Sequence, residues 1–338
     1  MANINILSID GGGIKGIISA MVLEKLEERL QVYSHNHNAR IADYFDLVAG
    51  TSTGAILTAI YLCPDKNRRP KFSAKDATNL YLYKGKEIFK RQPYYPLNTF
   101  FGLFGARYTN TEFKKILDLY FGNLQIGDLL KPCLITSYDT EKRSAIFFNT
   151  VSSKKGEDRE YLLKDSVLAS ASAPTYFNPA YIKSIRLKDN CLIDGGVFAN
   201  NPALCALVEG IKLEEFTNMN DVFLLSVANV STKVPYEYRK AKRWGLIGWA
   251  LPILDILMDA SEQTVDYQLE KIFSAIHLPN NYVRIEKEIE ERNFSIPRMD
   301  DVRPESIQKL IDIGYKIVEE EKENIDRIAR QLVESKRR

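Results

Sequence analysis

Residues 4–16 read INILSIDGGGIKG, and this stretch decides the fold class because it joins a short apolar run to a cluster of glycines. The run from Ile4 to Ile9 has the length and isoleucine content of a buried strand, and it stops at Asp10. Apolar residues then recur at helical spacing over residues 17–33, while charged residues fill the other side. The chain therefore opens with a predicted strand, a glycine loop and a helix.

A second unit of the same kind follows, with a strand predicted at 44–49 and a helix at 55–62. Two such units in succession predict parallel strands joined by right-handed crossovers. Further strands are expected at residues 132–138, 145–149, 191–193 and 222–227, and further helices at 203–216 and 306–318. The predicted fold class is accordingly α/β, with a mostly parallel central sheet.

The same pattern favours a single domain over residues 1–318, because no internal repeat or low-complexity linker interrupts it. This domain is expected to contain a variable insertion at about 64–130 that is rich in aromatic, proline and lysine residues. Residues 319–338 are predicted to form a charged helical tail, in which a few apolar residues keep helical register.

The composition is that of an ordinary globular protein: 338 residues, 45% hydrophobic and 27% charged, with 46 Lys+Arg against 44 Asp+Glu. A formal net charge of +2 argues against binding to a nucleic-acid polymer, which normally needs a strongly basic surface. The four cysteines are too widely spaced for a metal or redox motif. The first residues lack the pattern of a signal peptide, and no apolar run is long enough to span a membrane, so a cytoplasmic location is expected.

The sharpest motif is Gly50-Thr51-Ser52-Thr53-Gly54, a G-x-S-x-G between a predicted strand and a predicted helix. In a nucleophile elbow the two glycines permit a sharp turn that lifts the serine hydroxyl clear of the sheet. The start of the next helix adds a positive dipole end beside a developing oxyanion. Ser52 is therefore the candidate nucleophile, and the alternative is a turn whose Ser or Thr caps the helix.

The glycine loop, residues 10–16, formally satisfies G-x-G-x-x-G through Gly11, Gly13 and Gly16. A dinucleotide site also needs an acid at the end of the second strand, and that strand runs into the serine turn instead. A Walker A loop needs Ser or Thr after Lys15, where Gly16 stands. The remaining functional interpretation is a row of amides for an oxyanion, and the alternative is a tight structural turn.

A serine nucleophile needs a base, and the chain has only three histidines: His35, His37 and His277. The first two fall in a polar loop, where a solvated role is expected, whereas His277 could complete a Ser, Asp, His order. The competing base is Asp194, which a predicted strand delivers into an Asp-Gly-Gly turn. A desolvated carboxylate beside a serine can have its pKa raised enough to accept the proton. The residues alone leave both bases open.

In this order the motifs resemble those of the patatin-like phospholipases. The resemblance rests on residues 10–16, 50–54 and 194–196, and it extends to 169–177, 200–202 and 244–259. It implies a three-layer α/β/α fold and a dyad of Ser52 as nucleophile and Asp194 as general base, with no catalytic histidine, metal or cofactor. The implied oxyanion hole consists of the amides of Gly11, Gly12 and Gly13. The supporting motif residues are Asp10, Lys15, Gly16, Gly50, Gly54, Gly195 and Gly196.

The sequence departs from the family pattern after the strand 222–227, where such proteins often have a Gly-Thr-Gly turn. This chain has Ala228-Asn229-Val230 there, which we expect to shape the floor of the pocket. The departure therefore bears on substrate preference more than on the reaction.

The activity implied by the resemblance is that of a lipid acyl hydrolase of the phospholipase A or lysophospholipase type, acting on membrane phospholipids through an acyl-enzyme. The alternatives are a non-lipid serine esterase or acyltransferase with the same dyad, and a nucleotide-binding regulatory module. Some patatin-like proteins of similar size are switched on by a cyclic nucleotide, but no site for such an activator can be read in this sequence.

Two stretches are candidates for contact with lipid. Residues 236–252, YEYRKAKRWGLIGWALP, place four basic residues before both tryptophans, which suits peripheral contact with anionic headgroups. The alternative for this stretch is a solvated basic helix followed by one that packs in the core. Residues 84–108 interleave basic and aromatic side chains, and we expect a lid or an acyl-chain groove there rather than a nucleic-acid site.

Overall fold

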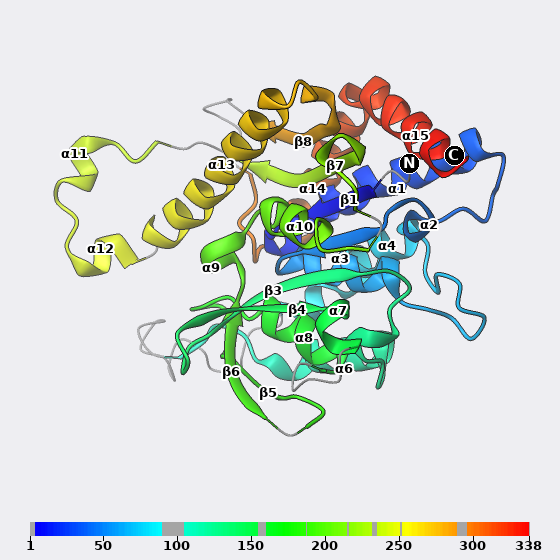
Figure 1. The fold of residues 1–338 in the computed structure, drawn as a ribbon. Coiled ribbons are helices and arrows are strands. Elements are labelled where there is room, and N and C mark those ends of the chain that lie inside the picture. The colour runs from blue at the N-terminus through cyan, green and yellow to red at the C-terminus, as the bar shows by residue number, and fades with distance from the viewer. Residues whose placement is uncertain are drawn as a thin grey trace.

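The computed structural model describes residues 4–89, 105–154, 160–186, 188–214, 216–231, 235–250, 252–288 and 296–337. Within these residues eight strands form one sheet, and Figure 1 shows helices on both of its faces. The strands are β1 (Ile4–Ile9), β2 (Leu47–Gly50), β3 (Cys133–Asp139), β4 (Ser144–Asn149), β5 (Ala180–Lys183), β6 (Asp189–Asp194), β7 (Val222–Ser231) and β8 (Tyr282–Glu288). Neighbours in the order β3-β2-β1-β7-β8 are parallel, whereas β4, β5 and β6 pair antiparallel. The predicted α/β fold with a mostly parallel central sheet is confirmed.

The described helices divide between the two faces of the sheet. They are α1 (Gly16–Ser34), α2 (Ile41–Tyr44), α3 (Thr53–Leu62), α4 (Ala74–Ile88), α6 (Asn110–Phe121), α7 (Thr150–Lys154), α8 (Leu163–Ser170), α9 (Gly196–Ala199), α10 (Ala203–Gly210), α11 (Tyr238–Ala241), α12 (Leu246–Ala250), α13 (Pro252–Ala275), α14 (Pro304–Glu320) and α15 (Lys322–Arg337). Leu7 and Ile9 of β1 belong to the larger apolar cluster, with α1, α3, α4, α14 and α15. Ile4 and Ile6 belong to the smaller one, with α10 and α13. This alternation along β1 is what a strand covered on both faces requires.

The segment predicted as a charged helical tail contains α15, which packs against α1. Its apolar residues, among them Ile325, Ile328 and Leu332, are buried in the larger cluster, and its charged residues face outward. The salt bridge between Arg29 and Asp326 joins the same two helices. The helix thus covers α1 as part of the hydrophobic core.

Two predicted elements were too long at one end by three or more residues. The strand expected from residue 44 begins at Leu47, because α2 continues through Tyr44 and Asp43 accepts the Arg40 amide at its start, at 2.9 Å. The helix expected over 203–216 ends at Gly210. Glycine is a poor helix former and commonly stands where a helix ends.

One edge of β3 is shared by two strands, and this arrangement positions the site. β2 pairs with β3 up to Gly50, opposite Ile135, and β6 pairs with it up to Asp194, opposite Ser137. Both lie on the same edge, because β4 occupies the other edge along the whole of β3. Since β2 and β6 run toward each other, their last residues stop two residues of β3 apart, about 7 Å. The turns that follow them therefore meet.

None of the helices in the described ranges combines the length and the apolar composition needed to cross a bilayer.

Candidate active site

Ser52 stands in a strained turn between β2 and α3. Its backbone has φ 55° and ψ −116°, a conformation that a residue with a side chain rarely adopts. The flanking glycines allow it: a Cβ on Gly50 would lie 2.2 Å from the Gly54 carbonyl oxygen, and one on Gly54 would lie 2.1 Å from that of Ile9. The Ser52 amide donates to Ser170 Oγ at 2.9 Å, which holds the turn from the side of α8. Strain of this kind is concentrated at functional sites.

Asp194, at the end of β6, has its carboxyl group near the Ser52 hydroxyl, which favours the ionised form of the carboxyl group. Its Oδ1 accepts the Gly196 amide at 2.7 Å. The residue is only 5% exposed, and burial raises the pKa of Asp194 to about 7, although the Gly196 amide and the Ser52 hydroxyl act in the opposite direction. A carboxyl group with that pKa exchanges protons near neutral pH, so it can serve as a base toward the serine.

The glycine loop between β1 and α1 runs beside Ser52 and is anchored at both ends. The Gly11 amide donates to the Asn200 carbonyl oxygen at 3.0 Å, and Asn229 Nδ2 donates to the Gly11 carbonyl oxygen at 2.7 Å. Farther along, the Ile14 amide donates to the Met299 carbonyl oxygen at 2.9 Å. Gly13 has φ 61°, and a Cβ there would lie 2.3 Å from that same Met299 oxygen, so only glycine fits.

Of the three amides predicted to form the oxyanion hole, these contacts occupy one and leave two without an acceptor among the described residues. The Gly11 amide is already engaged with Asn200. The amides of Gly12 and Gly13 have no acceptor among the described residues, and the same holds for Thr53, the first residue of α3. Two loop amides and a helix N-terminus thus remain available for an anion near Ser52.

Asn229 acts differently from the prediction for residues 228–230. These residues were expected to shape the floor of the pocket, but none of them lines it. Asn229 instead bridges the glycine loop and α1, because its Oδ1 accepts Ser19 Oγ at 2.9 Å while its Nδ2 holds Gly11. β7 also continues to Ser231, with a register shift after Val227 that belongs to this segment.

Behind the loop lies a buried group of charges. Asp10 is 1% exposed and forms a salt bridge with Arg284 of β8 at 2.8 Å, and Arg284 also pairs with Glu286 at 2.6 Å. Asn200, which binds Gly11 through its carbonyl oxygen, also donates from Nδ2 to Glu262 of α13. Burial, with the Asp10 charge nearby, raises the pKa of Glu262 well above its ordinary value. Glu262 therefore stays protonated beside an ionised Asp10, which avoids a second buried negative charge.

Lys15 lies at the junction of the glycine loop and α1. Burial lowers the pKa of Lys15, whereas the acidic residues Glu262, Asp259 and Asp255 of α13 act to raise it. Its place in the motif thus sets Lys15 near the acidic residues of α13.

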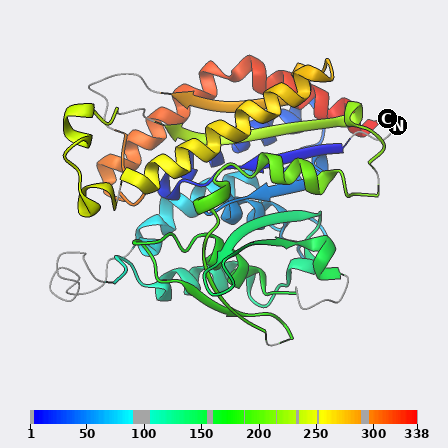
Figure 2. The same cartoon turned by 60° about the vertical axis from the view of Figure 1, so that its left-hand side comes forward.

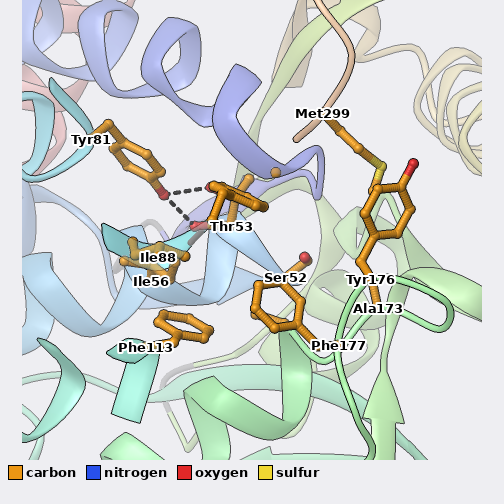
Figure 3. Close-up of a pocket in the computed structure, with 13 residues that line it drawn as sticks. Ser52, Thr53, Ile56, Tyr81, Ile88, Phe113, Ala173, Tyr176, Phe177 and Met299 are labelled. Carbon is orange, nitrogen blue, oxygen red and sulfur yellow. Dashed lines mark hydrogen bonds between the residues drawn. The ribbon is translucent and has the colours of Figure 1, made fainter. Parts of the chain in front are cut away.

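An apolar pocket opens beside Ser52, with about 440 Å³ of empty space including its mouth. Figure 3 shows its walls, which come from α3, α4, α6, the segment after α8 and the segment around Met299. The lining residues are Gly13, Ser52, Thr53, Ile56, Tyr81, Ile88, Phe89, Phe113, Ala171, Ala173, Tyr176, Phe177 and Met299. Tyr81 hydrogen-bonds Thr53 and so ties α4 to the elbow. Of the stretch predicted to form a lid or groove, Ile88 and Phe89 line the pocket, and residues 90–104 lie outside the described ones.

The histidines lie away from Ser52. His277 is exposed and precedes β8, so it lies at the N-terminal ends of the parallel strands. Ser52 follows β2 and therefore lies at the opposite, C-terminal ends of these strands. His35 and His37 are exposed in the loop after α1.

Three supporting residues were missed by the sequence interpretation as functional residues: Ser170, Asn200 and Asn229. Each binds the elbow or the glycine loop from more than a hundred positions away along the chain. Ser170 and Asn200 belong to segments of the resemblance, 169–177 and 200–202, and Asn229 to the departure from it at 228–230. These were the only signals that could have drawn attention to them.

Comparison with known proteins agrees with this geometry. A family model described as patatin-like phospholipase matches residues 7–207. Patatin-2-Kuras 3 of Solanum tuberosum is 32% identical over 332 residues, 93% of this chain and 83% of that protein. Patatin-04/09 of the same plant is 32% identical over 328 residues, 92% of this chain and 82% of that protein. The solved structure of VipD from Legionella pneumophila aligns with 99% of this chain and 67% of that one, at 13% identity and a TM-score of 0.40, a likeness too distant to carry an argument.

Proposed function

Because this chain belongs to the patatin-like phospholipase family, and is thereby a lipid acyl hydrolase, we propose that it cleaves fatty-acyl esters of phospholipids with Ser52 as nucleophile and Asp194 as general base. The activity is of the phospholipase A or lysophospholipase type. The observation that carries the proposal is the placement of Ser52, in its strained turn, beside the buried carboxyl group of Asp194 and an apolar pocket.

The first half of the reaction forms an acyl-enzyme. Asp194 takes the proton from Ser52 Oγ while this oxygen attacks the ester carbonyl carbon. The amides of Gly12 and Gly13, with that of Thr53, stabilise the oxyanion of the tetrahedral intermediate. The bond to the lysolipid oxygen then breaks, and the protonated Asp194 gives its proton to that oxygen.

The second half releases the fatty acid. Asp194 takes a proton from water as the water oxygen attacks the acyl carbonyl carbon, and the same amides hold the second oxyanion. The bond to Ser52 Oγ breaks, and Asp194 returns the proton to the serine. The enzyme ends as it began, and the products are a fatty acid and a lysophospholipid.

The pocket supports an acyl chain as the group that is bound. Phe113, Phe177 and Ile56 present apolar surface next to the Ser52 hydroxyl, as Figure 3 shows. Burial of a methylene group there contributes about 0.8 kcal/mol. A hydrocarbon chain therefore gains more from this pocket than a small polar acyl group does, which favours a lipid ester over a short or charged one.

The test is product analysis with phospholipid vesicles. The wild-type protein and Ser52→Ala are each incubated with mixed phospholipid vesicles, and the lipids are identified by mass spectrometry. We expect fatty acid and lysophospholipid from the wild type alone. Equal product from both proteins, or turnover of soluble esters with none of phospholipid, would contradict the proposal.

A further inference from the structure

Residues 235–250, which we call the arm, stand away from the body of the protein. The arm lies between β7 and α13 in the chain and contains α11 and α12. Figures 1 and 2 both show these two helices at the outer end of the molecule, beyond the start of α13. Because β7 is parallel to β1 and β2, the arm leaves the sheet at the same strand ends as Ser52 and the glycine loop.

The arm exposes large apolar side chains. Leu246 is 93% exposed and Trp249 is 39% exposed. On the first turns of α13, Ile253 and Leu257 continue this apolar surface, at 41% and 51% exposure. A series of exposed apolar residues along one segment is unusual for a surface that faces only water, and it marks a site of contact.

The arm is also the basic part of an otherwise balanced chain. Its exposed basic residues are Arg239, Lys240, Lys242 and Arg243. Against these four stands one acid, Glu237, so sixteen residues carry a net charge of +3 where the whole chain carries +2. Lys240 pairs with Glu237 at 3.4 Å, which leaves three cations in excess. This charge is complementary to an anionic surface.

Aromatic contacts hold the arm in one shape. Trp244 packs edge-on against Tyr236, with ring centroids 5.4 Å apart, and against Trp249, at 5.0 Å. Lys242 lies 5.6 Å from the centre of the Tyr238 ring. The apolar tip and its basic neighbours are thus presented together without first having to be ordered, which lowers the entropic cost of binding.

The acidic residues that follow the arm lie on one side of α13. Asp255, Asp259 and Glu262 are spaced to share that side, and all three act on Lys15 of the glycine loop. Asp255 also accepts the Tyr236 hydroxyl of the arm at 3.2 Å. The exposed apolar residues at the start of α13 fall on the opposite side of that helix, so these acids do not interrupt the apolar surface.

We propose that the arm docks the protein on the surface of an anionic phospholipid bilayer. Leu246 and Trp249 enter the boundary between headgroups and acyl chains, and the basic residues bind the anionic headgroups. Tryptophan and leucine beside lysine and arginine form the combination that suits this boundary, apolar within and charged at the rim.

Docking through the arm would bring the active site to its substrate. Met258 of α13 lies against the turn after Asp194, with its Cε 3.5 Å from where a Cβ on Gly196 would be. By the rise of an α-helix, Met258 is about 9 Å from the start of α13. The purpose of docking rests on the proposed phospholipase function, but docking itself can be measured without turnover.

The experiment uses Ser52→Ala, which keeps vesicles intact, and tryptophan fluorescence as the readout. Both tryptophans of the chain lie in the arm, so their emission reports on this segment alone. The protein is titrated with phosphatidylcholine vesicles that contain or lack phosphatidylglycerol, and binding is also measured by cosedimentation. We expect a blue shift and binding with phosphatidylglycerol, and about tenfold weaker binding without it.

Two arm variants and two matched controls test whether the arm is the surface that binds the vesicle. Arg239→Glu/Arg243→Glu and Leu246→Asp should each weaken binding about tenfold or more. Lys114→Glu/Lys309→Glu and Leu119→Asp change exposed residues on α6 and α14, outside the arm, and should leave binding as it is. If the arm variants bind like Ser52→Ala, or if they only convert a dimer to a monomer in gel filtration, the proposal is wrong.

A soluble short-chain ester separates this inference from the proposed function. For this assay the arm substitutions are made in the protein that retains Ser52. The variants should hydrolyse the soluble ester at the wild-type rate, and their activity on anionic vesicles should be about tenfold lower. A wild-type protein without esterase activity on either substrate would contradict the proposed function, and the binding titration would still decide the docking.

Discussion

The carbonyl oxygen of Asn200 accepts the backbone amide of Gly11 at 3.0 Å. The carbonyl of the same glycine accepts Asn229 Nδ2 at 2.7 Å, so the peptide group on each side of Gly11 is held by a residue from a distant part of the chain. In the proposed mechanism the next two amides carry the oxyanion. Their direction therefore depends on these two asparagines.

Asn229→Ala removes the side-chain anchor of the loop. We expect kcat on a soluble ester to fall by about tenfold to a hundredfold with KM little changed, because displaced amides stabilise the transition state less and affect ground-state binding little. The matched control is Asn281→Ala, which removes a similar bond, Nδ2 to the Val222 carbonyl oxygen at 2.9 Å, at the start of β7. An equal loss of kcat in both variants would point to general destabilisation.

The pKa of Asp194, about 7, predicts the pH dependence of hydrolysis. A base acts only when deprotonated, so kcat/KM should increase about tenfold per pH unit below this pKa and level off above it. The profile is measured with a soluble ester whose own ionisation does not change in this range. A profile that is flat from pH 5 to 8, or that decreases above 7, would contradict the role of Asp194 as base.

Ala173→Phe tests whether the pocket binds the acyl chain. Ala173 lies in the wall beside Tyr176 and Phe177, and a phenyl ring there would occupy part of the pocket volume. We expect kcat/KM to fall for a palmitoyl ester and to change little for a butyryl ester. The exposed Ala275 at the end of α13 offers a control with the same substitution. Equal losses for both esters would show that the chain binds elsewhere.

Glu262→Gln tests the buried charges behind the glycine loop. Since the folded-state pKa of Glu262 lies above its ordinary value of 4.5, the folded protein binds more protons than the unfolded one from about pH 4.5 upward. The free energy of unfolding contributed by this group therefore decreases as pH rises. Glutamine does not ionise, so the variant should gain stability relative to the wild type as pH increases from 5 to 8.

Urea unfolding at a series of pH values measures this difference. Glu334→Gln, an exposed position on α15, is the control and should follow the wild type at every pH. A difference between Glu262→Gln and the wild type that does not vary with pH would contradict a protonated Glu262.

Local sequence patterns identified Ser52 as the candidate nucleophile but left His277 and Asp194 open as its base, and the family resemblance selected Asp194. Ser52 stands between glycines that a sharp turn requires, and Asp194 ends an apolar run before two more glycines. What brings them together could not be predicted, because it depends on β6 pairing with β3 beyond the end of β2. Antiparallel pairing at that edge leaves no trace in the spacing of residues along the chain.

The anchors of the site escaped prediction for the same reason. Ser170, Asn200 and Asn229 act through long-range hydrogen bonds, and a serine or asparagine in a loop is ordinarily a turn residue. The packing of α15 on α1 was also hidden, since its few apolar residues are surrounded in sequence by charges. The helical register of these apolar residues indicates the buried side of α15, but not that this side packs on α1.

In the proposed mechanism Asp194 activates Ser52 without a histidine, and labelling with a fluorophosphonate tests this activation most directly. The reagent reacts with an activated serine, and intact-protein mass spectrometry follows the rate at which one adduct appears. We expect the wild type and His277→Ala to be labelled at the same rate on Ser52, and Asp194→Asn to be labelled at least about a hundredfold more slowly. Labelling of Asp194→Asn at the wild-type rate, or loss of labelling in a folded His277→Ala, would contradict the account.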